Sequence, residues 1–135
     1  MGTHFLADTN AGIDFLSGKL PAASAAWFQQ AIEDQHIALS VIVRIELLSW
    51  VGSPNDMQLL ADFIAATTIL GLDEPVIQQT IQLRQQYKVK LPDAIIAATA
   101  LVHGLPIITR NTGDFKAFTG LVALNPHEPT QLPTG

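Results

Sequence analysis

Most of the information about the fold lies in residues 91–109, which read LPDAIIAATALVHGLPIIT. Pro92 predicts the first turn of a helix, and Gly104 predicts the end of that helix. Between them, residues 94–102 are apolar on all sides, which is typical of a helix buried on more than one face. Residues 105–109 then predict a short apolar strand. A buried helix that leads into a buried strand indicates a parallel sheet covered on both faces.

The same alternation extends in both directions from this segment. Asn10 and Ser40 are good N-cap residues, and each stands just before a helical pattern. We therefore predict an α/β fold with a single five-stranded parallel sheet flanked by helices on both faces. The domain is predicted to span residues 1–124, and a Pro-containing C-terminal tail over 125–135 is expected to be extended and partly disordered. The predicted strands are 3–7, 36–40, 67–70, 105–109 and 120–124, and the predicted helices are 11–16, 21–33, 41–50, 55–66, 74–87 and 92–103.

Composition excludes several classes of protein. The chain has 135 residues, which suits one domain. It has no cysteine, which excludes a disulfide scaffold, a thiolate zinc site and a cysteine nucleophile. The net charge of −5 excludes a basic coat for nucleic acid, but a nucleic-acid enzyme remains open if cations neutralise its acids. Only 14% of the residues are charged, so we expect apolar surface to contact a partner.

The sequence favours a cytoplasmic protein without a membrane segment. The N-terminus lacks a basic signal-peptide region. The longest uncharged run, residues 94–109, is interrupted by His103, Gly104 and Pro106, and its two parts are too short to span a membrane.

Four acidic residues occupy unusual places. Asp8 directly follows the first predicted strand, and Glu46 lies one turn into the helix after the second. Asp93 lies in the first turn of the apolar helix, and Asp114 follows the fourth strand. The ligands of open parallel sheets bind beyond the carboxyl ends of the strands, so all four side chains are predicted to meet at this edge.

Apolar neighbours and mutual repulsion make this set costly. Glu46 shares a helix face with Ile42 and Trp50, and no Lys or Arg stands at the matching helical positions. Two charges about 4 Å apart repel by roughly 4 kcal/mol at an effective dielectric constant of ~20. A divalent cation removes this conflict, and an all-oxygen site favours Mg²⁺ or Mn²⁺. Such an ion suits phosphodiester hydrolysis, because it lowers the pKa of the attacking water and offsets charge in the transition state.

Each acid also has a purely structural interpretation. Asp8 could cap a turn, and Asp114 could cap a helix after Gly113. Asp93 could complement the dipole of its helix. Taken singly, these interpretations are favoured; Glu46 is the hardest to explain in this way, because it interrupts an apolar stripe. The function is indicated by the set of four, each predicted to lie at the carboxyl-end edge of the sheet.

Four stretches resemble the motifs of PIN-domain ribonucleases, and most closely those of VapC-type toxins of toxin–antitoxin modules. They are residues 6–10 (LADTN), 44–48 (RIELL), 91–100 (LPDAIIAATA) and 109–115 (TRNTGDF). The resemblance implies Mg²⁺- or Mn²⁺-dependent endonucleolytic cleavage of RNA. It also implies a homodimer and inhibition by a cognate antitoxin whose C-terminal segment lies along the active groove. No nucleotide cofactor is expected.

The resemblance assigns the four acids to catalysis and metal binding. We expect Asp8, Asp93 and Asp114 to be direct or water-mediated metal ligands. Glu46 is expected to be either a ligand or the group that orients the attacking water, and the sequence leaves both open. One metal ion or two about 3.5–4 Å apart would fit four carboxylates.

Supporting residues have two interpretations each. Thr9 either offers its hydroxyl to the site or caps the following helix. Asn111 is expected to brace the turn before Asp114. Arg110 and Lys116 flank Asp114 and either contact RNA or are solvated surface charge.

Other side chains are expected to be structural. Lys88 and Lys90 precede the Asp93 helix and either contact RNA or are surface charge, and surface charge is favoured. The histidines show no metal-ligand spacing, and the large aromatic residues are assigned mostly to the core, with a minor share available to an antitoxin groove. These aromatic residues are Trp27, Phe28, Trp50 and Phe63.

Two other functions remain open at this stage. A catalytically silent PIN-like binding module would have the same fold, but it would have no reason to keep four repelling acids. A phosphoaspartyl phosphatase or receiver domain would need further acids near the first strand, and Asp8-Thr9-Asn10 supplies none.

Overall fold

Five parallel strands form one sheet in the computed structural model, which describes residues 2–134. The strand order is β3-β2-β1-β4-β5, and every neighbouring pair is parallel. The predicted α/β fold with five parallel strands is confirmed. The strands are shorter than predicted, because the chain turns into the next element soon after each one. They are β1 (Phe5–Ala7), β2 (Ile37–Ser40), β3 (Thr68–Leu70), β4 (Ile107–Ile108) and β5 (Ala123–Leu124).

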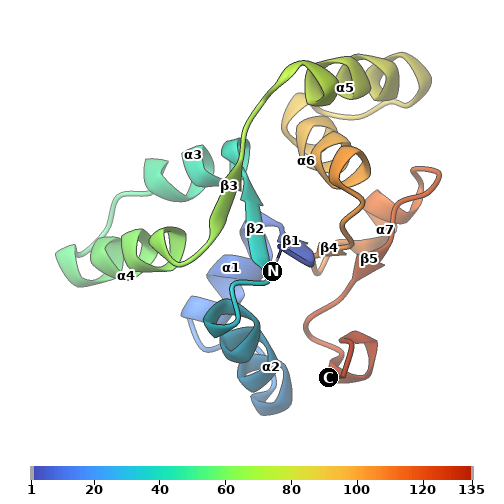
Figure 1. Cartoon of the computed structure of the whole chain (residues 1–135). Coiled ribbons are helices and arrows are strands. Elements are labelled where there is room, and N and C mark those ends of the chain that lie inside the picture. Colours follow the sequence, from blue (N-terminus) through green and yellow to red (C-terminus); the bar gives the residue numbers. More distant parts are fainter. Residues whose placement is uncertain (1, 135) are drawn as a thin grey trace.

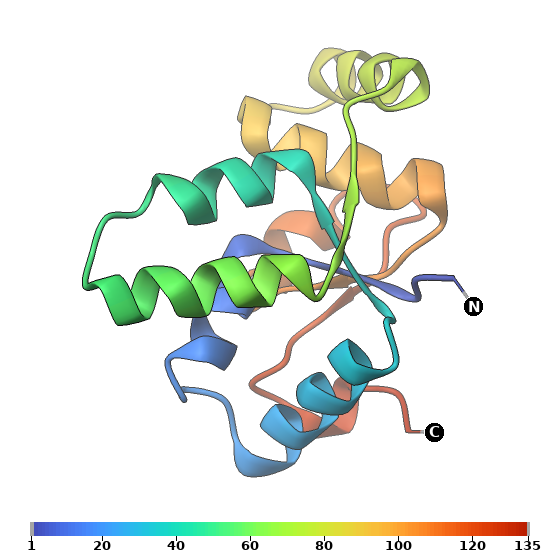
Figure 2. The same ribbon diagram turned by 60° about the vertical axis from the view of Figure 1, so that its left-hand side comes forward.

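Helices connect the strands and cover the sheet (Figure 1). In Figures 1 and 2, α6 lies on one side of the sheet and α2 on the opposite side. α5 runs beside α6, and α3 runs beside α4, so these four helices form two pairs. The helices are α1 (Thr9–Leu16), α2 (Ala22–Glu33), α3 (Val41–Ser49), α4 (Pro54–Ala65), α5 (Glu74–Gln86), α6 (Leu91–His103) and α7 (Thr112–Lys116), followed by the 3₁₀ turn Pro129–Gln131.

The core lies on both faces of the three central strands. Leu6, Ile37 and Ile107 are fully buried, as the continuous apolar strands of a doubly covered parallel sheet require. Alanines of α6 are buried as well, and their small side chains allow this helix to lie close to the sheet. On the α2 side, Phe15 and Phe28 stack with ring centroids 4.7 Å apart. Within residues 2–134, no helix is both long and apolar enough to cross a membrane.

Helix caps confirm two predictions and correct one. The Ser40 side chain accepts from the Ile42 backbone N–H and caps α3, as predicted. Gly104 ends α6 with a φ of 66°, a left-handed conformation that glycine adopts without steric cost. The prediction that Asn10 caps the first helix is wrong. α1 begins at Thr9, two residues before the predicted start, and the Asp8 side chain is its cap.

The C-terminal tail packs on the domain. The prediction of an extended, partly disordered tail is wrong for residues 125–134; Gly135 lies outside the described residues. Leu132 is only 5% exposed, and the Trp27 indole N–H donates to the Pro133 carbonyl at 2.7 Å. The buried leucine and the hydrogen bond from the tryptophan hold the tail against the domain, although its proline-rich composition predicted disorder. The domain boundary after residue 124 stays a prediction.

One aromatic residue departs from its predicted place in the core. Trp50 is 47% exposed, whereas Phe28 and Phe63 are buried and Trp27 is half-buried. α3 ends just before Trp50, so its ring lies over the surface between helices. Gly52 fits beneath that ring, because a Cβ atom at this position would lie only 2.0 Å from the indole.

Candidate active site

Three of the four predicted acids follow the carboxyl end of a strand, whereas Asp93 follows the helix α5. Asp8 stands between β1 and α1, and Glu46 lies in α3, directly after β2. Asp93 lies in the first turn of α6, and Asp114 lies in α7, after β4. Each of the two acids with a shifted pKa is influenced by other members of the set, so the four share one electrostatic environment.

Asp8 is the most enclosed of the four. Its residue is 6% exposed, and burial is the main cause that raises its pKa above the ordinary value of 3.8. Hydrogen bonds from Thr109 and from the Thr9 backbone lower the pKa in part, and the charges of Asp93 and Glu46 raise it further. Asp8 is thus a buried carboxylate that faces other carboxylates.

Two side chains that the sequence analysis did not single out for the site hold Asp8 in place. The Thr109 hydroxyl donates to Asp8 Oδ2 at 2.9 Å, and the Asn10 amide donates to the same oxygen at 3.0 Å. The side-chain oxygen Oδ1 of Asn10 accepts from the Arg110 backbone N–H at 3.0 Å, which links α1 to the loop after β4. Thr109 carried a signal in the sequence, because it is a polar residue at the end of an apolar strand.

Glu46 is exposed, which corrects the expectation of an apolar, poorly hydrated environment for this carboxylate. The Thr9 hydroxyl donates to Glu46 Oε1 at 2.8 Å. The Thr9 hydroxyl therefore contacts a predicted site residue, which agrees with the first interpretation of Thr9. The cap of the helix is Asp8 instead. Thr9 orients an exposed carboxylate that α3 alone would leave free to rotate.

Asp93 and Asp114 complete the set. Asp93 is half-buried, and its pKa is raised mainly by burial, then by the charges of Asp114 and Glu46, whereas Lys90 lowers it. Asp114 is exposed. Among residues 2–134, no Lys or Arg forms an ion pair with any of the four acids within 4.0 Å. The protein therefore leaves their charge largely uncompensated.

A fifth acid, Asp14 in α1, has a different environment. It is 1% exposed, and its carboxylate accepts two hydrogen bonds from Arg110 Nη1, at 3.1 and 3.0 Å. His127 Nε2 lies 2.7 Å from Asp14 Oδ2. Asp14 thus joins α1 to the loop after β4 and to the C-terminal tail.

The predicted supporting residues are placed differently from one another. The guanidinium of Arg110 is bonded to Asp14, and therefore it is directed to a structural partner. Asn111 precedes α7, and its backbone N–H donates to the Thr109 hydroxyl at 3.1 Å. Its carbonyl accepts from the Asp114 backbone N–H, which agrees with a bracing role. Lys116 is exposed in the last turn of α7.

The donor set fits a hard divalent cation. In the described part of the chain, no three acidic or histidine side chains stand close enough to hold one ion together. Mg²⁺ retains several waters and needs only one or two direct carboxylates. Four carboxylates that influence one another, with no Lys or Arg ion pair among residues 2–134, can supply these one or two ligands. Asp8 and Asp93 are the best-defined candidates for ligands. Both are at least partly buried, Asp8 at the N-terminus of α1 and Asp93 in the first turn of α6.

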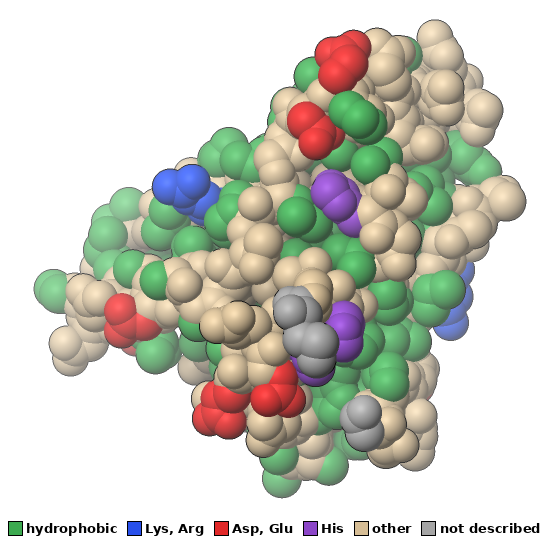
Figure 3. All heavy atoms as spheres, in the orientation of Figure 1, with side chains coloured by type: hydrophobic (Ala, Val, Ile, Leu, Met, Phe, Trp, Pro, Cys, Tyr) green, Lys and Arg blue, Asp and Glu red, His purple; other side chains and the backbone are tan. Residues whose placement is uncertain are grey.

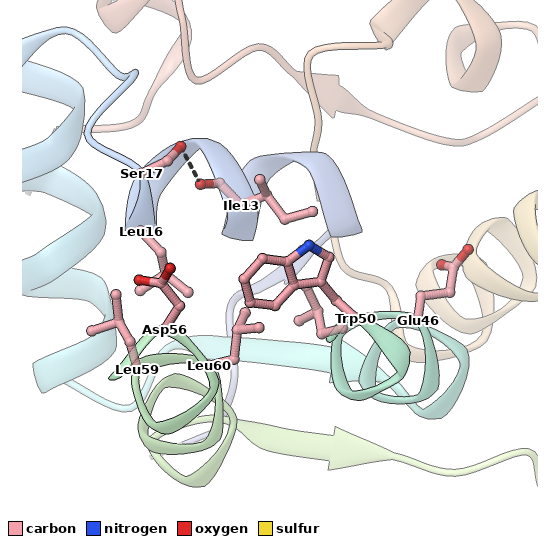
Figure 4. Close-up of a pocket in the computed structure, with 9 residues that line it drawn as sticks. Ile13, Leu16, Ser17, Glu46, Trp50, Asp56, Leu59 and Leu60 are labelled. Atoms are coloured by element: carbon pink, nitrogen blue, oxygen red, sulfur yellow. Dashed lines mark hydrogen bonds between the residues drawn. The ribbon is translucent and has the colours of Figure 1, made fainter. Parts of the chain in front are cut away.

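Beside Glu46 lies an apolar hollow between α1, α3 and α4 (Figure 4). Its volume is about 350 Å³. Figure 4 shows the Trp50 ring between Ile13 of α1 and Leu60 of α4, with Glu46 at the border. The Asp56 carboxylate lies on the other side of the hollow. This surface is apolar in the middle and acidic at its borders.

Comparison with known proteins identifies the class. The PIN domain family matches residues 5–121, and the chain belongs to this family. It is 30% identical over 121 residues to Ribonuclease VapC19 of Mycobacterium tuberculosis, an alignment that covers 86% of this chain and 95% of that protein.

Solved structures agree with this assignment. The toxin–antitoxin complex from Klebsiella pneumoniae contains a chain that is 35% identical, with a TM-score of 0.71 and coverage of 92% of this chain and 98% of that one. The DNA-bound VapBC from Salmonella typhimurium has a TM-score of 0.77 at 22% identity, covers 90% of this chain and 96% of its own, and supports the fold alone. The similarity to Ribonuclease VapC19 places the chain with VapC-type proteins.

Proposed function

We propose that this protein is a divalent-metal-dependent endoribonuclease that acts as the toxin of a toxin–antitoxin pair. The observation that carries the proposal is the set of four carboxylates at one sheet edge, none of which is ion-paired with a Lys or Arg among residues 2–134. The similarity to Ribonuclease VapC19 supports RNA as the substrate. The similarity to a toxin–antitoxin complex supports the biological role.

Asp8, Asp93 and Asp114 would hold Mg²⁺ or Mn²⁺, directly or through water. The ion would polarise the phosphate, lower the pKa of the attacking water and offset transition-state charge. Thr109 and Asn10 fix the direction of the Asp8 carboxylate, so this ligand is ordered before the ion binds. In hydrolysis, water oxygen forms a bond to phosphorus while the bond to the leaving oxygen breaks. Glu46, held by Thr9, is placed either to bind the ion or to orient that water.

RNA cleavage with matched variants tests the proposal. Purified protein is incubated with RNA and Mg²⁺ or Mn²⁺, and the same reaction is run with Asp8→Asn and Asp93→Asn. Asp62→Asn is the control, because this exposed acid lies in α4 and bonds only to Gln58. We expect cleavage by the wild type and the control and its loss in both site variants. Undiminished cleavage by both site variants would contradict the assignment.

A catalytically silent PIN-like module is the alternative. It would cut none of a broad set of RNAs, and calorimetry would show no binding of Mg²⁺ or Mn²⁺. The uncompensated carboxylates argue against this alternative, because a module that binds no cation would gain stability by losing them.

We also propose that the apolar hollow of α1, α3 and α4 receives the antitoxin. An antitoxin segment with apolar side chains for Ile13, Trp50 and Leu60 would bury this surface. A basic side chain on that segment would meet Glu46 and thereby occupy the active site. This arrangement would explain how binding of one segment inhibits cleavage.

Binding of the neighbouring-gene product tests this surface. Leu59→Asp, in the wall of the hollow, is expected to weaken the complex at least about tenfold and to leave RNA cleavage intact. Leu72→Asp is the matched control, because Leu72 is exposed to a similar degree but lies between β3 and α5. Equal losses in both variants would contradict the proposed surface. The homodimer stays a prediction, which a mass measurement in solution would test.

A further inference from the structure

The segment that joins α5 to α6, residues 87–90, is extended. Tyr87 and Lys90 have ψ values of 150°, and no helix or strand includes the four residues. Side chains alternate in an extended chain. Tyr87 and Val89 are half-buried and pack against the core, whereas Lys88 and Lys90 are exposed. The two apolar residues thus anchor the segment, and the two lysines share its outward side.

This segment forms one wall of a hollow that leads to the active site. The hollow has a volume of about 480 Å³ and is lined by both lysines and by Asp93 and Asp114. Phe118 lies in the same hollow, and the Tyr87 ring packs edge-on against it with centroids 4.9 Å apart. Two positive and two negative side chains therefore line one hollow, whose wall includes the packed rings of Tyr87 and Phe118.

The lysines of this hollow have no ionic partner within 4.0 Å among residues 2–134. Lys90 is nevertheless close enough to lower the pKa of Asp93, although burial outweighs it. Positive charge is scarce in this chain, which has seven Lys and Arg residues against twelve acids. On the face of the molecule that Figure 3 displays, Lys and Arg occupy only small, separate areas amid hydrophobic and neutral polar surface. Two lysines without an ionic partner among residues 2–134 therefore concentrate positive charge beside the acidic site.

We propose that Lys88 and Lys90 form a phosphate-binding subsite for the RNA strand, next to the phosphate that is cleaved. The proposal rests on the proposed ribonuclease function and extends it to the path of the substrate. A lysine ammonium is a point charge that attracts a phosphate without reading a base. The subsite would hold the strand in register while Asp93 and Asp114 act on the neighbouring linkage, and it would offset the repulsion between RNA and an acidic protein.

This assignment differs from the expectation for Arg110 and Lys116. The Arg110 guanidinium is bonded to Asp14, and Lys116 does not line the hollow. Lys88 and Lys90, for which the sequence favoured surface charge over RNA contact, are the ones that share a hollow with the acids. The structure therefore favours a path for the RNA strand along residues 87–90.

RNA binding measured without cleavage tests the subsite. Asp8→Asn serves as the background, so the RNA stays intact, and the affinity for a single-stranded RNA is measured by anisotropy at several salt concentrations. In this background we expect Lys88→Gln with Lys90→Gln to weaken binding about tenfold or more. The slope of log affinity against log salt should fall by about 1.4, since each phosphate contact to a single strand contributes about 0.7. Lys88→Arg with Lys90→Arg should keep both properties.

Lys19→Gln with Arg44→Gln is the matched control, because it removes the same charge from exposed positions outside the hollow. An equal effect of this control would overturn the proposal, and so would an unchanged salt slope in the double lysine variant. In cleavage assays on the chain with native Asp8, the double lysine variant should raise KM about tenfold and change kcat by less than about twofold. A fall in kcat with unchanged RNA affinity would mean that the lysines act on the acids instead, which also overturns it.

Failure of the proposed function gives a different result. If the wild type cleaves no RNA but the binding loss and the salt slope are as expected, the subsite stands and the endonuclease does not. Unfolding midpoints of all variants show whether each is folded at the assay temperature.

Discussion

Asp8 and Asp14 are two buried carboxylates of the same helix region, and the protein treats them in opposite ways. Asp14 accepts from Arg110 and lies against His127, so positively charged or polar partners surround its charge. Asp8 accepts only from neutral donors and is influenced by two other carboxylates. A buried carboxylate with cationic partners is a structural link, whereas Asp8, which has none among residues 2–134, fits the cation site proposed above.

The largest expected difference between the two sites is in RNA cleavage. Asp8→Asn is expected to reduce kcat/KM at least about 100-fold, because loss of a metal ligand removes several kcal/mol of transition-state stabilisation. Asp14→Asn is expected to retain most of the activity well below its unfolding temperature. Initial rates with Mg²⁺ or Mn²⁺ measure both, and an equal loss in the two variants would remove the distinction.

Stability should show the reverse order. Asp14→Ala leaves Arg110 and His127 without their shared partner and is expected to cost about 1–3 kcal/mol in the free energy of unfolding. Urea unfolding of the metal-free protein measures this cost. Asp62→Ala, at an exposed position of α4, is the control and should change stability by less than about 0.5 kcal/mol. A cost for Asp14→Ala no larger than that of the control would contradict a structural role.

The tail contributes a smaller part of the same link. His127→Ala is expected to cost about 0.5–1.5 kcal/mol, because it removes one hydrogen bond to Asp14 while Arg110 remains. Hydrogen exchange of the Arg110 and Asn111 amides should rise in this variant if the tail supports the loop after β4. Unchanged exchange there would show that the tail is packed on the domain but not coupled to the loop.

The smallest expected effect is a pH dependence of the stability that Asp8 causes. Burial raises the pKa of Asp8 above 3.8, so the folded chain keeps this proton to a higher pH than the unfolded chain does. The free energy of unfolding therefore falls as pH rises through this range, and the cost is complete above the folded-state pKa. In metal-free protein, the stability of Asp8→Asn relative to the wild type should increase from about pH 4 to pH 7. A constant difference would show that Asp8 pays no cost for burial.

The sequence was sufficient for the sheet and for the position of the four acids. Short apolar runs define the strands, Asp8 marks the carboxyl end of the first one, and Pro92 and Gly104 define the limits of the buried helix. Because these signals are local in the sequence, the order of helices and strands could be predicted from it. Whether the four acids perform the proposed chemistry stays a prediction.

Partners from distant parts of the chain could not be predicted. Thr109 and Asp14 gain their roles from contacts with residues about a hundred positions away, and no local pattern specifies such pairs. The docked tail is similar, because a proline-rich composition gave no sign of the pocket for Leu132 or of the bond from Trp27. Trp50 is exposed because α3 ends just before it, and sequence patterns determine the ends of helices poorly.

Titration of Mn²⁺ into the metal-free protein, followed by calorimetry, tests the central claim most directly. The account predicts that the wild type and Asp14→Asn bind the ion alike, while Asp8→Asn and Asp93→Asn bind it at least about tenfold more weakly. Absence of binding by the wild type, or equal binding by Asp8→Asn and the wild type, would contradict the claim that the four carboxylates form a site for a divalent cation.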